Sequence, residues 1–138
     1  MIVLDTNVVS ELMRPGPAPA VVGWVRGCDA RELQTTAITV AEIGYGIRRL
    51  ADGQRRDRLQ SAADELFGRF ANQVLTFDIP AAEQYASLVT ERERAGRPID
   101  GFDAQIAAIC LAHGSTLATR NTKDFEGPGV TVIDPWAG

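Results

Sequence analysis

The sequence begins Met1-Ile2-Val3-Leu4-Asp5-Thr6-Asn7, and we interpret this stretch as the element around which the rest of the chain is organised. Its apolar residues carry no charge and no helical spacing, which is typical of a short strand buried on both faces. The strand ends at Asp5, and Thr6 and Asn7 are suited to cap the helix that the apolar residues of segment 8–13 indicate. Asp5 is then expected in the crevice between strand and helix, where open α/β sheets bind ligands. The alternative is that Asp5 only caps the helix.

The composition indicates an ordinary globular protein, because 45% of the residues are hydrophobic and 23% are charged. A length of 138 residues fits a single domain, 1–138, with a core between helices and a sheet. No apolar stretch approaches the roughly 20 residues of a membrane span, and the N-terminus lacks the basic region of a signal peptide, so we expect a cytoplasmic protein without membrane contact. Cys28 and Cys110 are too few for a disulfide framework, and Cys110 lies in an apolar stripe typical of a core helix.

The charge balance limits the partners of the protein. A net charge of -4 excludes a general polyanion binder, so any contact with nucleic acid must be local. Of the 14 basic residues 13 are arginine, and five of these arginines lie within residues 48–58. Such a run fits a solvated helix face, and it fits equally a surface that binds phosphate oxygens or the carboxylates of a partner.

Four further segments are predicted to be strands: 33–38, 74–77, 115–119 and 130–133. Helical spacing, caps and breakers predict helices between them, over approximately 18–25, 39–52, 54–70, 80–95 and 101–113, with a short turn or helix at 121–125. Connections of this length favour parallel strands and right-handed crossovers. The predicted fold class is therefore α/β, a three-layer α/β/α domain with a central parallel five-stranded sheet.

Four acidic residues at strand ends or near helix starts form the candidate site: Asp5, Glu42, Asp103 and Asp124. Apolar residues three, four and seven positions after Asp103 place its side chain on a buried helix face, where an unpaired carboxylate is costly. Glu42 also matches a capping box that begins at Thr39, and Asp124 also fits a polar turn. Asp100 is a nearby alternative that is explained more simply as a capping residue.

The available donor types limit the chemistry of such a site. One histidine, His113, and two scattered cysteines are too few for a zinc site or for a cysteine–histidine nucleophile. Carboxylates together with the side-chain oxygen of Asn121 suit Mg²⁺ or Mn²⁺. A hard cation in an open carboxylate site can bind phosphate, activate water and stabilise the leaving oxygen, which are the requirements of phosphodiester hydrolysis.

Several blocks of the sequence occur in a specific order: 3–12 (VLDTNVVSEL), 39–42 (TVAE), 103–108 (DAQIAA), 119–125 (TRNTKDF) and 132–136 (VIDPW). In this order and spacing the blocks resemble the PIN-domain ribonucleases, and the last block is similar to their VapC-type toxin branch, particularly its FitB-like members. The resemblance extends over nearly the whole chain.

The resemblance implies a PIN-like fold, an acidic Mg²⁺ or Mn²⁺ site and an endoribonuclease activity that a cognate antitoxin inhibits. Position by position, the acidic metal-binding and catalytic residues of the family match Asp5, Glu42, Asp103 and Asp124, and its supporting polar residues match Thr6 and Asn121. The resemblance also implies an RNA substrate, a homodimer, and a hetero-oligomer with a VapB- or FitA-like antitoxin that itself binds DNA.

Two other classes of protein stay open. A metal-dependent phosphatase or receiver-like domain would use Asp78 as phosphoacceptor and Lys123 as its partner, although it leaves the block around Asp103 unexplained. A binding protein that pairs with a partner on DNA would use the acids for a structural metal only. Metal-dependent RNA cleavage separates the three classes.

Overall fold

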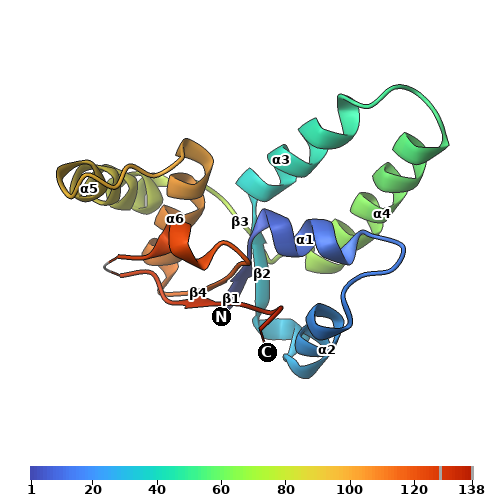
Figure 1. Ribbon diagram of the computed structural model, residues 1–138, viewed down its shortest axis with the longest axis horizontal. Helices are drawn as coiled ribbons and strands as arrows, with labels where there is room; N and C mark the ends of the chain where they lie inside the picture. Colours follow the sequence, from blue (N-terminus) through green and yellow to red (C-terminus); the bar gives the residue numbers. More distant parts are fainter. Residues whose placement is uncertain (128, 138) are drawn as a thin grey trace.

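The computed structural model describes residues 1–127 and 129–137 (Figure 1). The strands are β1 (Ile2–Leu4), β2 (Leu33–Thr36), β3 (Val74–Leu75), β4 (Thr116–Ala118) and β5 (Val132–Ile133). The α-helices are α1 (Thr6–Leu12), α2 (Pro19–Gly27), α3 (Ala37–Arg48), α4 (Gln54–Phe70), α5 (Ile79–Arg94) and α6 (Gly101–His113). Two short 3-10 helices are η1 (Ala30–Glu32) and η2 (Thr122–Phe125). The predicted helix 54–70 and helix 101–113 are thus confirmed residue for residue.

The five strands form one sheet in the order β3-β2-β1-β4-β5, and every neighbouring pair is parallel. β1 is the central strand, with Ile2 opposite Leu33 on one side and opposite Thr116 on the other. The carboxyl ends of β1, β2 and β4 therefore meet at one edge of the sheet, where open α/β sheets form ligand-binding crevices. The predicted parallel α/β fold is confirmed.

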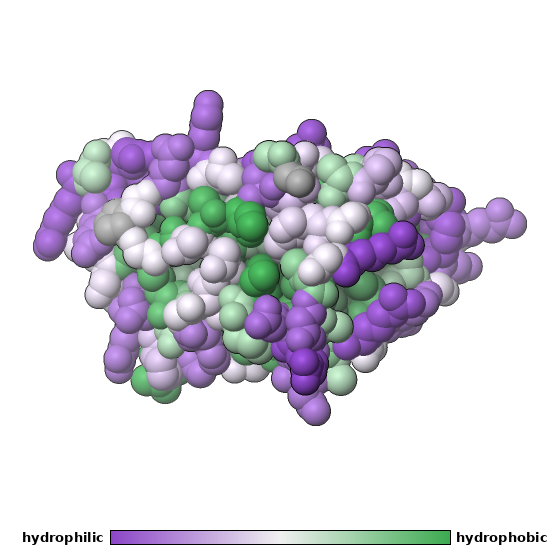
Figure 2. All heavy atoms as spheres, turned by 90° about the horizontal axis from the view of Figure 1, so that it is seen from below, coloured by the Kyte–Doolittle hydropathy of each residue, from purple (hydrophilic) through white to green (hydrophobic). Residues whose placement is uncertain are grey.

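Alternation along β1 produces two cores, one on each face of the sheet. Leu4 packs with the helices α1 to α4, whereas Val3 packs with α5 and α6, because successive strand residues point to opposite faces. Figure 1 shows the same three layers, with the sheet between α5 and α6 on one side and the other helices on the opposite side. Figure 2 shows the molecule from below relative to Figure 1. Apolar residues gather in the middle of this face, and hydrophilic side chains project around its rim.

The strands are shorter than the sequence predicts, and for β2 the reason is a capping side chain. The hydroxyl of Thr36 accepts a hydrogen bond from the Thr39 backbone N–H at 3.1 Å, so β2 ends at Thr36 and α3 begins with Ala37. Thr36 rather than Thr39 is thus the cap of α3. In the same way Asp5, and not Thr6 or Asn7, caps α1.

Helix α6 carries the predicted signals at both ends. Its cap is Asp100, whose Oδ1 accepts the Phe102 N–H at 2.8 Å, and it ends at Gly114, which has a left-handed φ of 63°. Cys110 is buried in its apolar face, and both cysteines have free thiols. None of the helices in the described ranges is long and apolar enough to cross a membrane.

A buried arginine ties α5 to the chain that follows it. Arg92 is 8% exposed, and its Nε donates to the Arg97 carbonyl at 2.7 Å. One of its terminal nitrogens also donates to the carbonyls of Asp124 and Glu126, at 3.1 and 3.3 Å. The guanidinium thereby fixes η2, which carries Asp124, against the loop that precedes α6.

The arginines of segment 48–58 are mostly exposed, as expected for a solvated helix face. Arg56 pairs with Asp52, and Arg49 lies 5.8 Å from the centre of the Tyr45 ring. Helix α3 ends at Arg48, with Arg49 as its C-cap, rather than near Asp52 as the sequence predicts, and Gly53 with a φ of 154° is the N-cap of α4.

Candidate active site

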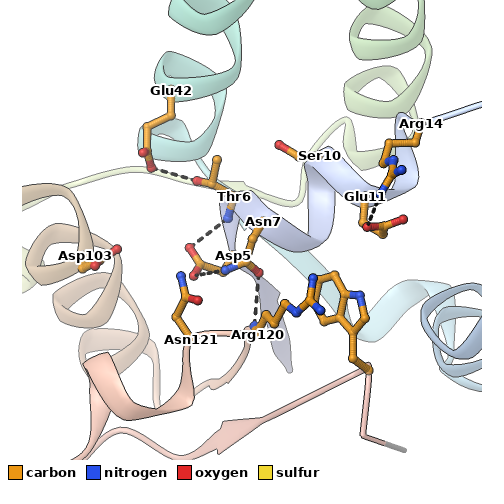
Figure 3. A pocket seen from close by; sticks show the side chains of 11 residues that line it. Asp5, Thr6, Asn7, Ser10, Glu11, Arg14, Glu42, Asp103, Arg120 and Asn121 are labelled. Atoms are coloured by element: carbon orange, nitrogen blue, oxygen red, sulfur yellow. Dashed lines mark hydrogen bonds and ion pairs between the residues drawn. The ribbon is translucent and has the colours of Figure 1, made fainter. Parts of the chain in front are cut away.

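A pocket of about 510 Å³ opens at the carboxyl ends of β1 and β4 (Figure 3). Its walls come from the start of α1, from α3 and α6, and from the segments that follow β4 and β5. The residues that line it are Asp5, Thr6, Asn7, Ser10, Glu11, Arg14, Glu42, Asp103, Arg120, Asn121 and Trp136. Three of the four predicted acids and both predicted supporting residues therefore share one pocket.

Asp5 lies at the base of this arrangement and is 3% exposed. Its Oδ1 accepts the Thr6 backbone N–H at 2.8 Å, which caps α1. Its Oδ2 accepts the Thr119 hydroxyl at 2.8 Å and the Asn7 amide at 3.5 Å. Burial raises the pKa of Asp5, although the hydrogen bonds from Thr119 and Thr6 act in the opposite direction. Capping of α1 uses only Oδ1 of Asp5. Capping alone therefore does not explain why Thr119 and Asn7 donate to Oδ2.

Glu42 is held toward Asp5 by Thr6. The Thr6 hydroxyl donates to Glu42 Oε1 at 2.8 Å, and it also lies 3.0 Å from the Thr39 hydroxyl. Because Thr36 caps α3, Glu42 lies beyond the first turn and does not form the capping box that the sequence allows. Burial raises the pKa of Glu42, and the negative charges of Asp5 and Asp100 add to this effect.

Asp103 projects into the pocket from the first turn of α6. Burial, and after it the negative charges nearby, together raise its pKa to about 6. Those charges belong to Asp5, Asp100, Asp124 and Glu42. These four charges act on Asp103, as expected if the acids predicted from the sequence lie close together.

Asp124 is placed differently from the other three acids. It is exposed on η2 and lies outside the walls of the main pocket. Together with Asp100 and Asp103 it lines a smaller cavity of about 130 Å³ that shares Asp103 with the main pocket. Its charge nevertheless raises the pKa values of Asp5 and Asp103. Asp124 therefore belongs to the same acidic region, on its outer side.

Sequence reasoning did not identify several residues of this pocket. Thr119 donates to Asp5, accepts the Asn7 amide at 3.2 Å and accepts the Asn121 backbone N–H at 3.1 Å. A signal for Thr119 existed, since it follows the buried strand β4 as Asp5 follows β1. Arg120 follows Thr119 directly, whereas Trp136 had no comparable signal, because the pairing of β5 with β4 brings the C-terminal segment to the pocket.

The acidic region fits a hard cation by charge and donor type. None of the ion pairs within the described chain includes Asp5, Glu42, Asp103 or Asp124. Burial is the first cause that raises the pKa values of Asp5, Glu42 and Asp103, and neighbouring carboxylates raise them too. Carboxylates are ligands that Mg²⁺ and Mn²⁺ prefer. Over residues 1–127 and 129–137, however, no three acids lie close enough to hold one ion together as they stand. The fit is therefore to an ion that binds few protein ligands and keeps water, which is the habit of Mg²⁺.

The receiver-like alternative does not fit this geometry. Asp78 is the cap of α5, accepting the Ala81 N–H at 3.1 Å, and Lys123 is exposed on η2. Neither residue lines the acidic pocket.

Comparison with known proteins assigns this fold and pocket to a class. The PIN domain matches residues 2–127, so the chain belongs to the PIN-domain family. Within it, the chain is 41% identical to the VapC ribonuclease Y4jK of Sinorhizobium fredii over 137 residues, 99% of this chain and 98% of that protein. It is 44% identical to the plasmid stability protein StbB of Pseudomonas syringae pv. tomato over 140 residues, 99% of each chain. The structure of FitAB bound to an IR36 DNA fragment superposes with a TM-score of 0.92 at 37% identity, covering 99% and 96% of the two chains. The resemblance seen in the sequence is confirmed.

The raised pKa of Asp103 predicts a specific pH dependence of stability in EDTA. The folded protein holds this proton more tightly than the unfolded chain, so its stabilising effect is complete below about pH 4 and is lost as pH rises through about 6. Asp103→Asn removes this titration. Relative to wild type, the free energy of unfolding of the variant should therefore be higher at neutral pH than at acid pH by about 1 kcal/mol, a figure that allows for solvent screening of the half-buried group. Urea unfolding at both pH values measures it, with exposed Asp64→Asn as the control. Equal pH dependence in wild type and Asp103→Asn would exclude this electrostatic account.

Proposed function

We propose that the protein is a metal-dependent endoribonuclease that acts as the toxin of a toxin–antitoxin pair. The observation that carries the proposal is the buried Asp5 carboxylate, aligned by Thr6, Thr119 and Asn7 in a pocket with two further acids. Membership of the PIN-domain family and similarity to a VapC ribonuclease over nearly the full chain support it.

The residues proposed to hold the metal are Asp5 as a direct ligand and Glu42 or Asp103 beside it, with Asp124 on the outer side of the same acidic region. Thr6 orients Glu42 through its hydroxyl, and Asn121 offers a further side-chain oxygen on the pocket wall. When bound, Mg²⁺ or Mn²⁺ would supply phosphate binding, water activation and stabilisation of the leaving oxygen. The other alternative from the sequence, a binding protein that uses the acids for a structural metal only, does not require an open pocket at the acids.

The proposed substrate is RNA in single-stranded or looped form, because splayed nucleotides enter a crevice that a duplex cannot. The products would carry a 5′-phosphate and a 3′-hydroxyl. A route through the 2′-hydroxyl requires acid–base side chains such as a histidine pair, and His113 is exposed at the end of α6, away from the pocket walls. Products with a 2′,3′-cyclic phosphate would contradict this mechanism.

The proposed partner is a cognate antitoxin, VapB- or FitA-like, that also binds DNA. The chain is similar to Toxin FitB of Neisseria gonorrhoeae and to the structure of FitAB bound to an IR36 DNA fragment, and a VapBC2 structure from Rickettsia felis is also bound to a DNA fragment. A pocket lined by uncompensated acids attracts an arginine or lysine from a partner's flexible tail. We also propose a homodimer, which light scattering of the purified toxin tests directly.

Asp5→Asn is the variant that tests the proposed catalytic centre. Asparagine caps a helix as well as aspartate does, so the fold should persist, whereas the carboxylate charge is lost. We expect weaker binding of Mn²⁺ and a loss of RNA cleavage of at least about 100-fold. Calorimetric titration measures the binding of Mn²⁺, and cleavage of labelled RNA in Mg²⁺ measures the activity. The matched control is Asp57→Asn, at an exposed position of helix α4. Unchanged metal affinity and activity in Asp5→Asn would remove Asp5 from the site.

Competition between cation and antitoxin tests the proposed control. A guanidinium in the acidic pocket would pair with these carboxylates and exclude Mg²⁺, so inhibition should weaken as the Mg²⁺ concentration rises. Replacing the tail's basic residue by alanine should restore part of the cleavage while apolar contacts keep the complex together. Gel filtration and RNA cleavage measure the two properties. Full inhibition by the alanine variant at every Mg²⁺ concentration would show instead that the antitoxin blocks access of RNA.

A further inference from the structure

Arg120 and Trp136 contact each other on the wall of the acidic pocket. The guanidinium carbon of Arg120 lies 5.0 Å from the centre of the Trp136 ring, within the range of a cation–π contact. Both residues line the pocket that holds Asp5 (Figure 3). Neither residue takes part in the hydrogen bonds that hold the Asp5 carboxylate.

Contacts from two directions fix this pair in place. The Arg120 backbone N–H donates to Asn7 Oδ1 at 3.2 Å, which joins the arginine to helix α1. Trp136 is half-buried against the core that contains Leu4, and its backbone N–H donates to Asp134 Oδ1 at 2.9 Å. The arginine side chain therefore has a positioned support, although it is exposed to solvent.

The charge of Arg120 is not used by another side chain of the described chain. Among the ion pairs of residues 1–127 and 129–137, none includes Arg120. The other arginine of this pocket, Arg14, lies 3.4 Å from Glu11. Arg120 is thus a cation on the wall of a pocket rich in acids, and none of its side-chain N–H groups donates a hydrogen bond within the described residues.

We propose that Arg120 binds a backbone phosphate of the RNA next to the phosphate that reaches the acids, and that Trp136 is its positioning residue. The inference rests on the proposed function, because it places the substrate strand across a pocket whose acids otherwise repel it. The guanidinium group can donate to two phosphate oxygens. Contact with the aromatic ring restricts the arginine side chain before RNA binds, so that less conformational entropy is lost on binding.

Salt dependence of RNA binding tests this phosphate contact. The probe is a fluorescein-labelled single-stranded RNA, measured by anisotropy in EDTA so that no cleavage occurs. Arg120→Ala should weaken binding about 10-fold and lower the slope of log K against log salt by about 0.7, the value for one phosphate on a single strand. Arg120→Lys keeps the charge and should keep the slope. Arg69→Ala is the control, because Arg69 is an exposed charge outside the pocket. It lies at the end of α4, which leads into the start of β3, whereas the pocket lies at the carboxyl ends of the strands.

Trp136 is tested through kinetics in Mg²⁺. Trp136→Leu should raise KM several-fold with little change in kcat, whereas Trp136→Phe keeps an aromatic support and should restore KM. Equal loss with both substitutions would make the tryptophan a packing residue only and overturn its positioning role.

The outcomes separate the subsite from the proposed function. An unchanged salt slope in Arg120→Ala overturns the phosphate contact, and weaker binding with an unchanged slope assigns Arg120 to stacking on a base instead. Failure of the wild-type protein to cleave RNA in Mg²⁺ or Mn²⁺ overturns the proposed function, whatever the slope. Cleavage by wild type together with an unchanged slope overturns the subsite alone.

Discussion

Burial of one carboxylate at the end of the central strand is the constraint on which the rest of the structure depends. Asp5 is removed from water by the sheet on both sides of β1, and a buried carboxylate is costly unless donors surround it. The fold supplies those donors from the start of α1 and from the end of β4, through Thr6, Asn7 and Thr119. Strand order, the break after Leu4 and the position of Thr119 are therefore parts of one arrangement.

The other acids add negative charge to a region that already holds Asp5. Thr6 directs Glu42 inward, the cap at Asp100 sets the start of α6 and hence Asp103, and Arg92 fixes the backbone of η2. Each of these contacts positions an acid without neutralising it. Binding of the proposed cation would recover the free energy that this repulsion costs the folded chain. The same field reaches Cys110, where burial first and then the charge of Asp5 raise the thiol pKa to about 12, so this cysteine is an inert core residue.

The fold was predictable because its signals are local. The apolar run before Asp5, the glycine after α6 and the spacing within 54–70 each define an element from neighbouring residues, and connection length then favours parallel strands. Strand ends were less predictable, since Thr36 and Thr39 both have hydroxyls that can cap, and only the backbone geometry decides between them.

Three of the four predicted acids and the supporting residues Thr6 and Asn121 line the pocket, whereas its contacts with residues distant in sequence were not predictable. Asp5, Glu42 and Asp103 occur in the pocket as the sequence indicates, although the capping-box interpretation of Glu42 was wrong because α3 begins earlier. Thr119 contacts Asp5 across 114 positions of sequence, and Trp136 reaches the pocket only through the pairing of β5. Contacts of such separation follow from the assembled sheet and leave no periodic pattern in the chain.

Anomalous diffraction from crystals soaked in Mn²⁺ tests the central claim most directly, because it locates the ion without reference to activity. We predict one strong anomalous peak in the acidic pocket, with an Asp5 carboxylate oxygen as a direct ligand and with Glu42 or Asp103 beside it. A peak elsewhere on the protein, with Asp5 bonded only to Thr6, Thr119 and Asn7, would contradict the account.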